Sequence, residues 1–237
     1  MAPALDGALF VKAHPHTFTW AEQWVDRVIH WVGLCAAAVG FVVLLLMAAD
    51  ATDGSPLLWA SLVIYGVGLL GMLGCSAVNN HDFGERSRWA ELFARLDHAG
   101  ILLMIAATYT PLALHMLGGL GGVLLCLVVW SGALVGMAVQ LIARGPVPMR
   151  WSLGLYVLLG WCGIVALQPL LSSASLTVLG LILCGGVLYS LGIPFFLWRR
   201  LPYNRAIWHA FVVAGAACHY VAVLLGVVLG GGLAASQ

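Results

Sequence analysis

The chain has 237 residues, of which 62% are hydrophobic and only 8% are charged. Soluble domains average about 25% charged residues, so a water-soluble fold of this size is excluded. The formal net charge of +1 excludes nucleic acid as a partner, because such proteins carry a strongly basic surface. The composition therefore predicts an integral membrane protein whose partners are membrane lipids.

The basic residues fall into alternating gaps between seven long apolar stretches, beginning with Lys12 and Arg27 before the first. Short loops rich in lysine and arginine stay on the cytoplasmic side of a membrane. The pattern predicts an all-α, multi-pass protein of the cell membrane with seven transmembrane helices, a cytoplasmic N-terminus and an outside C-terminus. We expect the membrane to be the bacterial inner membrane. The other basic residues are Arg86, Arg88, Arg95, Arg144, Arg150, Arg199, Arg200 and Arg205.

Each expected span has about the 20 residues needed to cross the hydrocarbon layer. The gaps are too short for a separate soluble domain. We therefore expect a cytoplasmic segment with an interfacial helix over 1–27, a single transmembrane domain over 28–229 and an outside tail over 230–237. The spans cover residues 28–49, 57–80, 97–117, 121–143, 151–171, 175–197 and 207–229.

Two segments on the cytoplasmic side have the composition of interfacial helices. Thr19 and Glu22 have the spacing of a capping box, in which hydroxyl and carboxylate close free amides at a helix start. Trp20 and Trp24 follow one turn apart. Residues 87–96 place tryptophan, leucine and phenylalanine on one face and charges on the other. Both segments are expected to anchor the bundle in the headgroup layer.

Polar residues within the spans gather toward the cytoplasmic side. His30 and His209 lie near the starts of their spans, Asp97 begins the third, and Ser76 and Asn80 lie at the end of the second. Ionisable groups within spans are costly and by default mark a functional site. One interpretation is a polar chamber open to the cytoplasm. The other is a set of helix-end caps, since an acid near a helix N-terminus is favourable.

Three further polar features lie deeper or at the far end. His219 is interpreted as a hydrogen-bonded interior histidine and His115 as a lone histidine near the outer surface. Pro111 interrupts the third span and predicts a kink, with Thr108 and Thr110 able to satisfy freed carbonyl groups. The kink would shape the bundle or open a cavity, and the sequence leaves both open.

Four segments have, in order, the motifs of a known membrane-protein family. Residues 22–33 follow a Glu…Asn…His…Gly pattern with Asp26 where asparagine is usual, and residues 96–111 (LDHAGILLMIAATYTP) resemble a third-helix signature. Residues 185–192 and 206–212 resemble sixth- and seventh-helix motifs. Together these segments resemble the hemolysin III-like proteins, the bacterial branch of the progestin and adipoQ receptor group. Their seven-helix, N-inside topology agrees with the charge pattern.

The resemblance implies a zinc site near the cytoplasmic side. Its ligands would come from Ser-x-x-x-His in helix two, His-x-x-x-His in helix seven and a nearby aspartate of helix three. Asp97 and His209 match and are the candidate metal ligands, but Asn80 and Arg205 stand where two histidines are usual. Zinc needs three or four nitrogen, sulfur or carboxylate ligands, so we expect an altered or absent zinc site. Arg205 is expected to pair with Asp97 in place of the metal.

Three functions were weighed for this chain. We favour a sensor or regulator of membrane lipid state, whose cytoplasm-facing cavity holds a lipid headgroup or merely stabilises the bundle. The alternative is a zinc-dependent hydrolase of lipid amides, similar to ceramidases, with metal-bound water as nucleophile; without metal, Asp97 and His209 are the candidate catalytic residues. A pore-forming hemolysin ranks last, since no span carries a string of charges. The expected polar cluster is Ser76, Asn80, Asp97, Arg205, His209 and His30.

Overall fold

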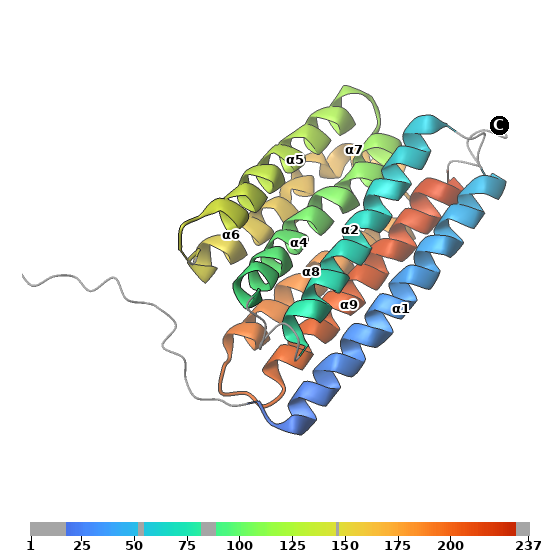
Figure 1. Cartoon of the computed structure of the whole chain (residues 1–237). Helices are drawn as coiled ribbons and strands as arrows, with labels where there is room; N and C mark the ends of the chain where they lie inside the picture. The colour runs from blue at the N-terminus through green and yellow to red at the C-terminus, as the bar shows by residue number, and fades with distance from the viewer. Residues whose placement is uncertain (1–17, 52–54, 82–88, 146, 231–237) are drawn as a thin grey trace, which may run out of the picture.

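The chain folds as a bundle of long helices (Figure 1). The structure is a computed structural model and describes residues 18–51, 55–81, 89–145 and 147–230, among which no strand occurs. Seven helical segments are long and apolar enough to cross a membrane, which confirms the all-α fold with seven spans. The elements are α1 (Trp20–Ala51), α2 (Pro56–Asn80), α4 (Ala90–Pro111), η1 (Leu112–Leu117), α5 (Gly119–Ile142), α6 (Met149–Gly160), η2 (Cys162–Ala166), α7 (Leu167–Ser173), α8 (Leu176–Leu197), α9 (Asn204–Val223) and η3 (Leu224–Leu229).

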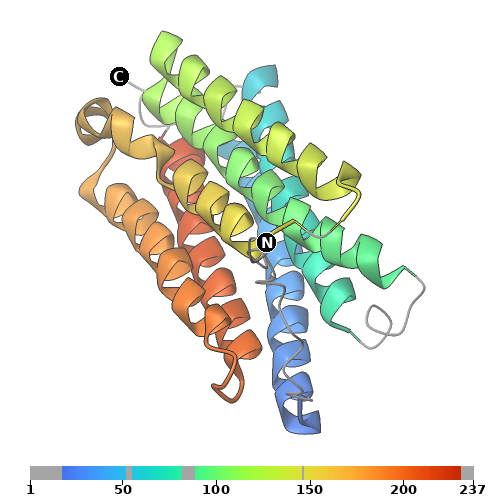
Figure 2. The same ribbon diagram turned by 90° about the vertical axis from the view of Figure 1, so that its left-hand side faces the viewer.

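The helices pack around α2, α4 and α9. Helix α1 lies beside α2 and α9, α2 packs on α4, α4 on α5, and α8 on α9. Figure 2, seen from the side of α5 and α6, has α1 behind them. The first and last spans are therefore direct neighbours, and residues far apart in the sequence meet where α1 and α9 begin.

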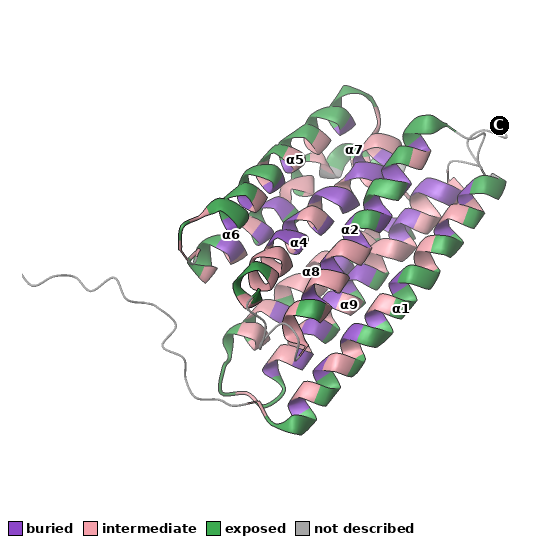
Figure 3. Ribbon diagram, in the orientation of Figure 1, coloured by how far each residue is buried: buried purple, intermediate pink, exposed green. Residues whose placement is uncertain are grey.

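The outward faces of the bundle are apolar. Figure 3 shows exposed residues along the outside of the helices and buried ones between them. Large side chains such as Leu120, Ile142 and Leu176 are exposed, whereas Tyr65 and Leu62 are fully buried. Water would penalise such a surface, but lipid tails do not. The burial pattern agrees with a multi-pass membrane protein.

The first span begins earlier than expected. The capping box is present: Glu22 Oε2 accepts from the Thr19 amide at 2.7 Å, and Thr19 Oγ1 accepts from the Glu22 amide at 3.3 Å. From there α1 runs unbroken from Trp20 to Ala51, so the residues expected to form an interfacial helix are continuous with the helix of the first span. The second interfacial segment likewise continues into α4, which begins at Ala90. Its residues 87 and 88 lie outside the described part of the chain.

The fifth span is interrupted. Helix α6 ends at Gly160, a 3-10 turn follows, and α7 is a separate short helix. The Tyr109 hydroxyl holds this break, because it donates to the Gly160 carbonyl at 2.9 Å and accepts from the Gly163 amide at 2.7 Å. Both backbone groups lose helical partners at the break, and in an apolar surrounding they need replacements.

The third span changes its helical winding at Pro111. Helix α4 ends there and continues as the π-helical segment η1. Thr108 donates to the Met104 carbonyl at 2.8 Å and Thr110 to the Ala106 carbonyl at 2.9 Å. Pro111 has no amide proton, so the helical bond that it removes is the one to the Ala107 carbonyl, whereas the two threonine hydroxyls donate to the carbonyls one turn before each of them. The turn into α5 uses Gly118, whose φ of 63° suits a residue without a side chain.

Helices α2 and α4 approach closely at Gly68. A Cβ atom at Gly68 would collide with the Cβ of Ala107 on α4, whereas one at Gly74, on the same helix, would meet nothing within 4 Å. Small residues at such crossings let two membrane helices pack backbone to backbone. The two glycines therefore differ in role although they share a helix.

We expect Gly68→Ala to destabilise the bundle by about 1–3 kcal/mol, because the added methyl overpacks the α2–α4 contact. Gly74→Ala is the matched control and should be neutral or stabilising by up to about 1 kcal/mol, since alanine is the better helix former. Thermal unfolding of the purified protein in detergent micelles measures both. Equal midpoints for the two variants would contradict the close packing at Gly68.

Candidate functional site

A cavity of about 140 Å³ opens at the end of the bundle where α1, α4 and α9 begin and α2 ends. We call this the basic end, because Arg27, Arg95, Arg144 and Arg200 lie there. It is the end that the charge pattern predicts to be cytoplasmic. The cavity is lined by His30, Met72, Leu73, Ser76, Asn79, Asn80, Asp97, His98, Ile101, Met149, Leu153, Tyr156, Phe196, Arg205, Trp208, His209, Val212 and Val213.

All six residues of the expected polar cluster line this cavity. They come from four helices: His30 from α1, Ser76 and Asn80 from α2, Asp97 from α4, and both Arg205 and His209 from α9. Side chains four residues apart on a helix share a face, which explains why both members of the α2 and α9 pairs point inward. The structure thus places the predicted polar residues around one space.

Asp26 is the residue at the centre of the site, and we did not select it from the sequence as a site residue. Its side chain is 2% exposed and lies between α1 and α9. Oδ1 is 2.6 Å from His209 Nδ1, and Oδ2 is 2.8 Å from Arg205 Nε. The sequence did hold a signal, because Asp26 replaces the asparagine that is usual in the first-helix motif.

The partner of Arg205 differs from the expected one. We expected a pair with Asp97, but Arg205 forms an ion pair with Asp26, and the Asp97 carboxylate accepts from Asn79 Nδ2 at 2.8 Å. The reason is topological: α9 packs directly on α1, whereas Asp97 is on α4. The Arg205 guanidinium also lies 4.3 Å from the centre of the Phe18 ring, a favourable cation–π distance.

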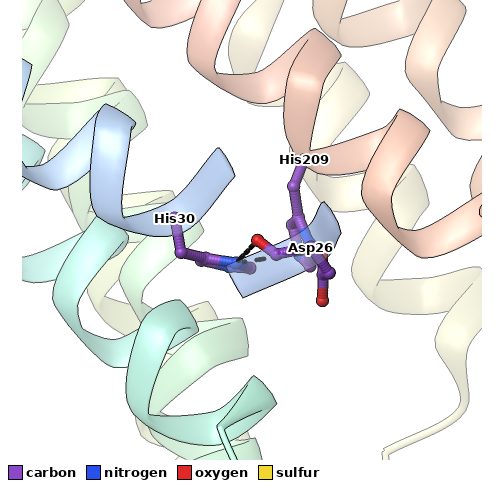
Figure 4. Close-up of side chains that lie close together, drawn as sticks. All are labelled: Asp26, His30 and His209. Carbon is purple, nitrogen blue, oxygen red and sulfur yellow. Dashed lines mark hydrogen bonds and ion pairs between the residues drawn. The ribbon is translucent and has the colours of Figure 1, made fainter. Parts of the chain in front are cut away.

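Two histidines converge on one serine. His30 Nε2 lies 3.2 Å and His209 Nε2 3.4 Å from Ser76 Oγ, and the two ring centres are 4.2 Å apart. Figure 4 shows His209 of α9 beside Asp26, with His30 on the same helix as Asp26. Asn80 Nδ2 donates to the Ser76 carbonyl at 2.9 Å and lies 3.4 Å from its hydroxyl.

The hydrogen-bond partners assign the tautomers of both rings. His30 Nδ1 is 2.8 Å from the Asp26 carbonyl oxygen and His209 Nδ1 is 2.6 Å from the Asp26 carboxylate, so each Nδ1 donates. Each neutral ring then presents its Nε2 lone pair to Ser76. A serine hydroxyl has a single proton and can donate to only one of them at a time.

Two of the residues at the family's zinc positions, Asn80 and Arg205, lack the character of zinc ligands. The Asn80 amide is hydrogen-bonded to Ser76, and the permanently charged Arg205 sits against Asp26, where it would repel a cation. Another set does have ligand character: one atom each of Asp26, His30 and His209 lie within 4.8 Å of one another. Three such ligands are what a catalytic zinc uses, although Asp26 is already shared between His209 and Arg205.

Glu22 fixes the rim of the site. Besides capping α1, its Oε1 accepts from the Tyr203 amide at 2.9 Å, in the loop that leads into α9. Tyr203 has a left-handed backbone with φ of 59°, a conformation uncommon for a residue with a side chain. One carboxylate therefore closes the start of α1 and holds the start of α9 beside it.

Two histidines outside this cavity, His219 and His115, have structural partners. His219 Nε2 lies 3.2 Å from the Ile182 carbonyl oxygen, which confirms it as a hydrogen-bonded interior histidine. His115 was expected to stand alone, and that was wrong, because its Nε2 lies 2.9 Å from Ser61 Oγ. Both partners lie on neighbouring helices, which a single sequence does not align.

Seven apolar helices that enclose a buried carboxylate between an imidazole and a guanidinium define a multi-pass membrane protein with a polar site near one end. The sequence model of the family described as "Haemolysin-III related" matches residues 18–220, and the chain belongs to this family. The four motifs therefore indicated the family correctly.

Its relatives include bacterial and animal proteins. The chain is 33% identical over 207 residues to "Hemolysin-3 homolog" of Bacillus subtilis (strain 168), which covers 87% of this chain and 95% of that one. It is 32% identical over 203 residues to "Hemolysin-3" of Bacillus cereus, covering 86% and 90%. It is 30% identical over 165 residues to "Monocyte to macrophage differentiation factor" of Homo sapiens, covering 68% and 67%.

We expect Arg205→Ala to lower the free energy of unfolding by about 3–5 kcal/mol, because it leaves the Asp26 carboxylate buried without its cation. Adding Asp26→Asn should recover part of this loss, since both charges are then gone. Arg200→Ala, an exposed arginine of the preceding loop, is the control and should change stability by less than about 0.5 kcal/mol. Unfolding in detergent micelles checks all three; additive effects of the two changes at Asp26 and Arg205 would contradict the pairing.

Proposed function

We propose that the chain is a sensor or regulator of membrane lipid state whose cavity at the basic end binds a lipid headgroup. The observation that carries the proposal is the placement of opposite charges on the cavity wall, with Asp97 on α4 and Arg205 on α9. A headgroup with both an ammonium and a phosphate group complements such a wall. The proposal therefore names a zwitterionic phospholipid as the ligand.

Apolar surface continues from the cavity toward the middle of the bundle. A second cavity of about 100 Å³ shares Met72, Ile101, Tyr156 and Trp208 with the first, and its other lining is mainly apolar. An amphiphile with its head at Arg205 would have room for the start of an acyl chain there. This continuity supports a lipid rather than a small soluble solute.

Binding of a headgroup in the cavity would affect the contact between α1 and α9 through Arg205. A phosphate near its guanidinium competes with Asp26 for the same cation, and the Asp26–Arg205 pair joins α1 to α9. A bound headgroup would therefore loosen the first span from the last at the basic end. That differential interaction is what a sensor of lipid state requires.

The headgroup proposal predicts a lipid-specific stabilisation that depends on Asp97. Short-chain phosphatidylethanolamine should raise the thermal midpoint of the protein in micelles more than phosphatidylglycerol of equal chain length, because only the former offers an ammonium group. Asp97→Asn should abolish the difference between the lipids, and Glu91→Gln, an exposed acid on the same helix, should retain it. Equal shifts from both lipids in the unsubstituted protein would sink the proposal.

A zinc-dependent hydrolase of lipid amides is the second candidate. The observation that favours it is the set of Asp26, His30 and His209, whose ligand atoms lie within 4.8 Å of one another. Zinc held there would supply a water of lowered pKa as a nucleophile near neutral pH. The charge of Arg205 next to Asp26 opposes this reading.

Metal content separates the two candidates. The sensor predicts purified protein without stoichiometric zinc, whereas the hydrolase predicts about one zinc per chain that is lost in His30→Ala and His209→Ala and kept in His115→Ala. Elemental analysis by mass spectrometry after size-exclusion chromatography measures this. One zinc per chain with that mutational pattern would replace the sensor by the hydrolase as the favoured function.

A further inference from the structure

We propose that Ser76 is an activated nucleophile, with His209 as its general base and Asp26 as the residue that positions His209. The three side chains form a carboxylate–imidazole–hydroxyl relay: Asp26 Oδ1 lies 2.6 Å from His209 Nδ1, and His209 Nε2 lies 3.4 Å from Ser76 Oγ. They come from α1, α9 and α2. The inference goes beyond headgroup binding and concerns metal-free acyl transfer.

The relay has the proton arrangement that nucleophilic serine requires. Because Asp26 accepts from His209 Nδ1, the lone pair of His209 is at Nε2, which faces the Ser76 hydroxyl. The short bond to the carboxylate stabilises the imidazolium that forms when the proton moves. The separation of 3.4 Å is longer than a strong hydrogen bond, and contacts of this kind tighten when substrate binds.

His30 also faces Ser76 but has a different partner at its other ring nitrogen. Its Nδ1 donates to a neutral carbonyl, that of Asp26 at 2.8 Å, and is 3.8 Å from the Asp26 carboxylate. An imidazolium at His30 would therefore gain less stabilisation than one at His209. The Ser76 hydroxyl can donate to His30 Nε2 at 3.2 Å or to His209 Nε2 at 3.4 Å, and only the second orientation belongs to the relay.

The surroundings of Ser76 suit an acyl substrate. Ser76 lines the cavity, as do Asn80 and Arg205, so a carbonyl group can reach it from the basic end. Asn80 Nδ2, 3.4 Å from Ser76 Oγ, is a donor close to where the carbonyl oxygen becomes negative. Leu73 and Ile101 provide apolar wall for the acyl group. The substrate class is a carboxylic ester.

The reaction balances with water as the only co-reactant. Ser76 Oγ adds to the ester carbonyl carbon while its proton passes to His209 Nε2. Collapse of the tetrahedral intermediate breaks the bond to the alcohol oxygen, which leaves with that proton. Water then adds to the acyl-Ser76 ester by the same relay, which releases the carboxylic acid and restores the hydroxyl group.

A second serine–histidine pair in the same chain provides a comparison. Ser61 Oγ lies 2.9 Å from His115 Nε2, but its hydroxyl donates to the Leu58 carbonyl at 2.8 Å. Among the interactions that the structure gives for this pair, none involves a carboxylate. The pair therefore has the residue types but not the relay, and Ser61 is not expected to react.

The test uses a fluorescent fluorophosphonate probe on the full-length protein in detergent micelles. An activated serine displaces fluoride from phosphorus and keeps the phosphonate as a stable ester. We expect labelling at Ser76, identified by peptide mass, that is lost in Ser76→Ala, retained at the unsubstituted rate in Ser61→Ala and unchanged by a chelator. Labelling elsewhere, or none in folded unsubstituted protein, would overturn the inference.

The roles of His209 and Asp26 are tested by the kinetics of labelling. His209→Gln and Asp26→Asn should lower the maximal labelling rate by about 100-fold or more. The probe concentration that gives the half-maximal rate should stay unchanged. Asp26→Glu should restore part of the rate. Thermal midpoints of the same samples identify a variant that does not fold. If a variant does not fold, the labelling of Ser76 in the unsubstituted protein still tests the proposal. Unaltered maximal rates in the folded His209 variant would refute the relay.

Discussion

A carboxylate that is 2% exposed inside an apolar helix bundle is stable in its charged form only if donors and cations surround it. Asp26 meets this condition with His209 on one oxygen and Arg205 on the other. Because these partners belong to α9, the charge of Asp26 fixes how the first span lies against the last. The orientation of His209, and hence the direction of its Nε2 toward Ser76, depends on the same contact.

The basic end is built so that this contact is shielded from water. Glu22 ties the start of α1 to the loop before α9, and Phe18 covers the Arg205 guanidinium. Electrostatic attraction strengthens as the surroundings become less polar, so the shielding strengthens the attraction between Asp26 and Arg205. The shielding also limits how ligands can approach the Asp26–Arg205 pair, since the open side of the basic end is the cavity lined by Asn80 and Asp97.

Much of the fold was predictable because lipid imposes simple rules on a chain. Span length, apolar composition and the capping box at Thr19 were all visible in the sequence, and the structure has them. The break after Gly160 was not visible, because it depends on a hydroxyl from Tyr109 in another span. Segment boundaries follow from local chemistry, whereas interruptions of this kind follow from packing between helices.

The polar site was predictable in its members but not in its pairing. Depth along each span placed Ser76, Asp97 and His209 on one side of the membrane, and all three line one cavity. Which acid meets Arg205 depends on helix adjacency, and a single sequence carries no record that α1 packs on α9. Asp26 was overlooked for the same reason, since its partner lies 179 positions away along the chain.

The two departures from the family pattern explain each other. An acid at position 26 in place of asparagine would leave a buried negative charge, and an arginine at position 205 in place of histidine would leave a cation beside it. Together they meet at 2.8 Å and neutralise one another. The arginine thus supplies the positive charge that a buried carboxylate needs. Because the pair engages Oδ2 and leaves Oδ1 to His209, the buried charge is balanced while the imidazole stays oriented toward Ser76.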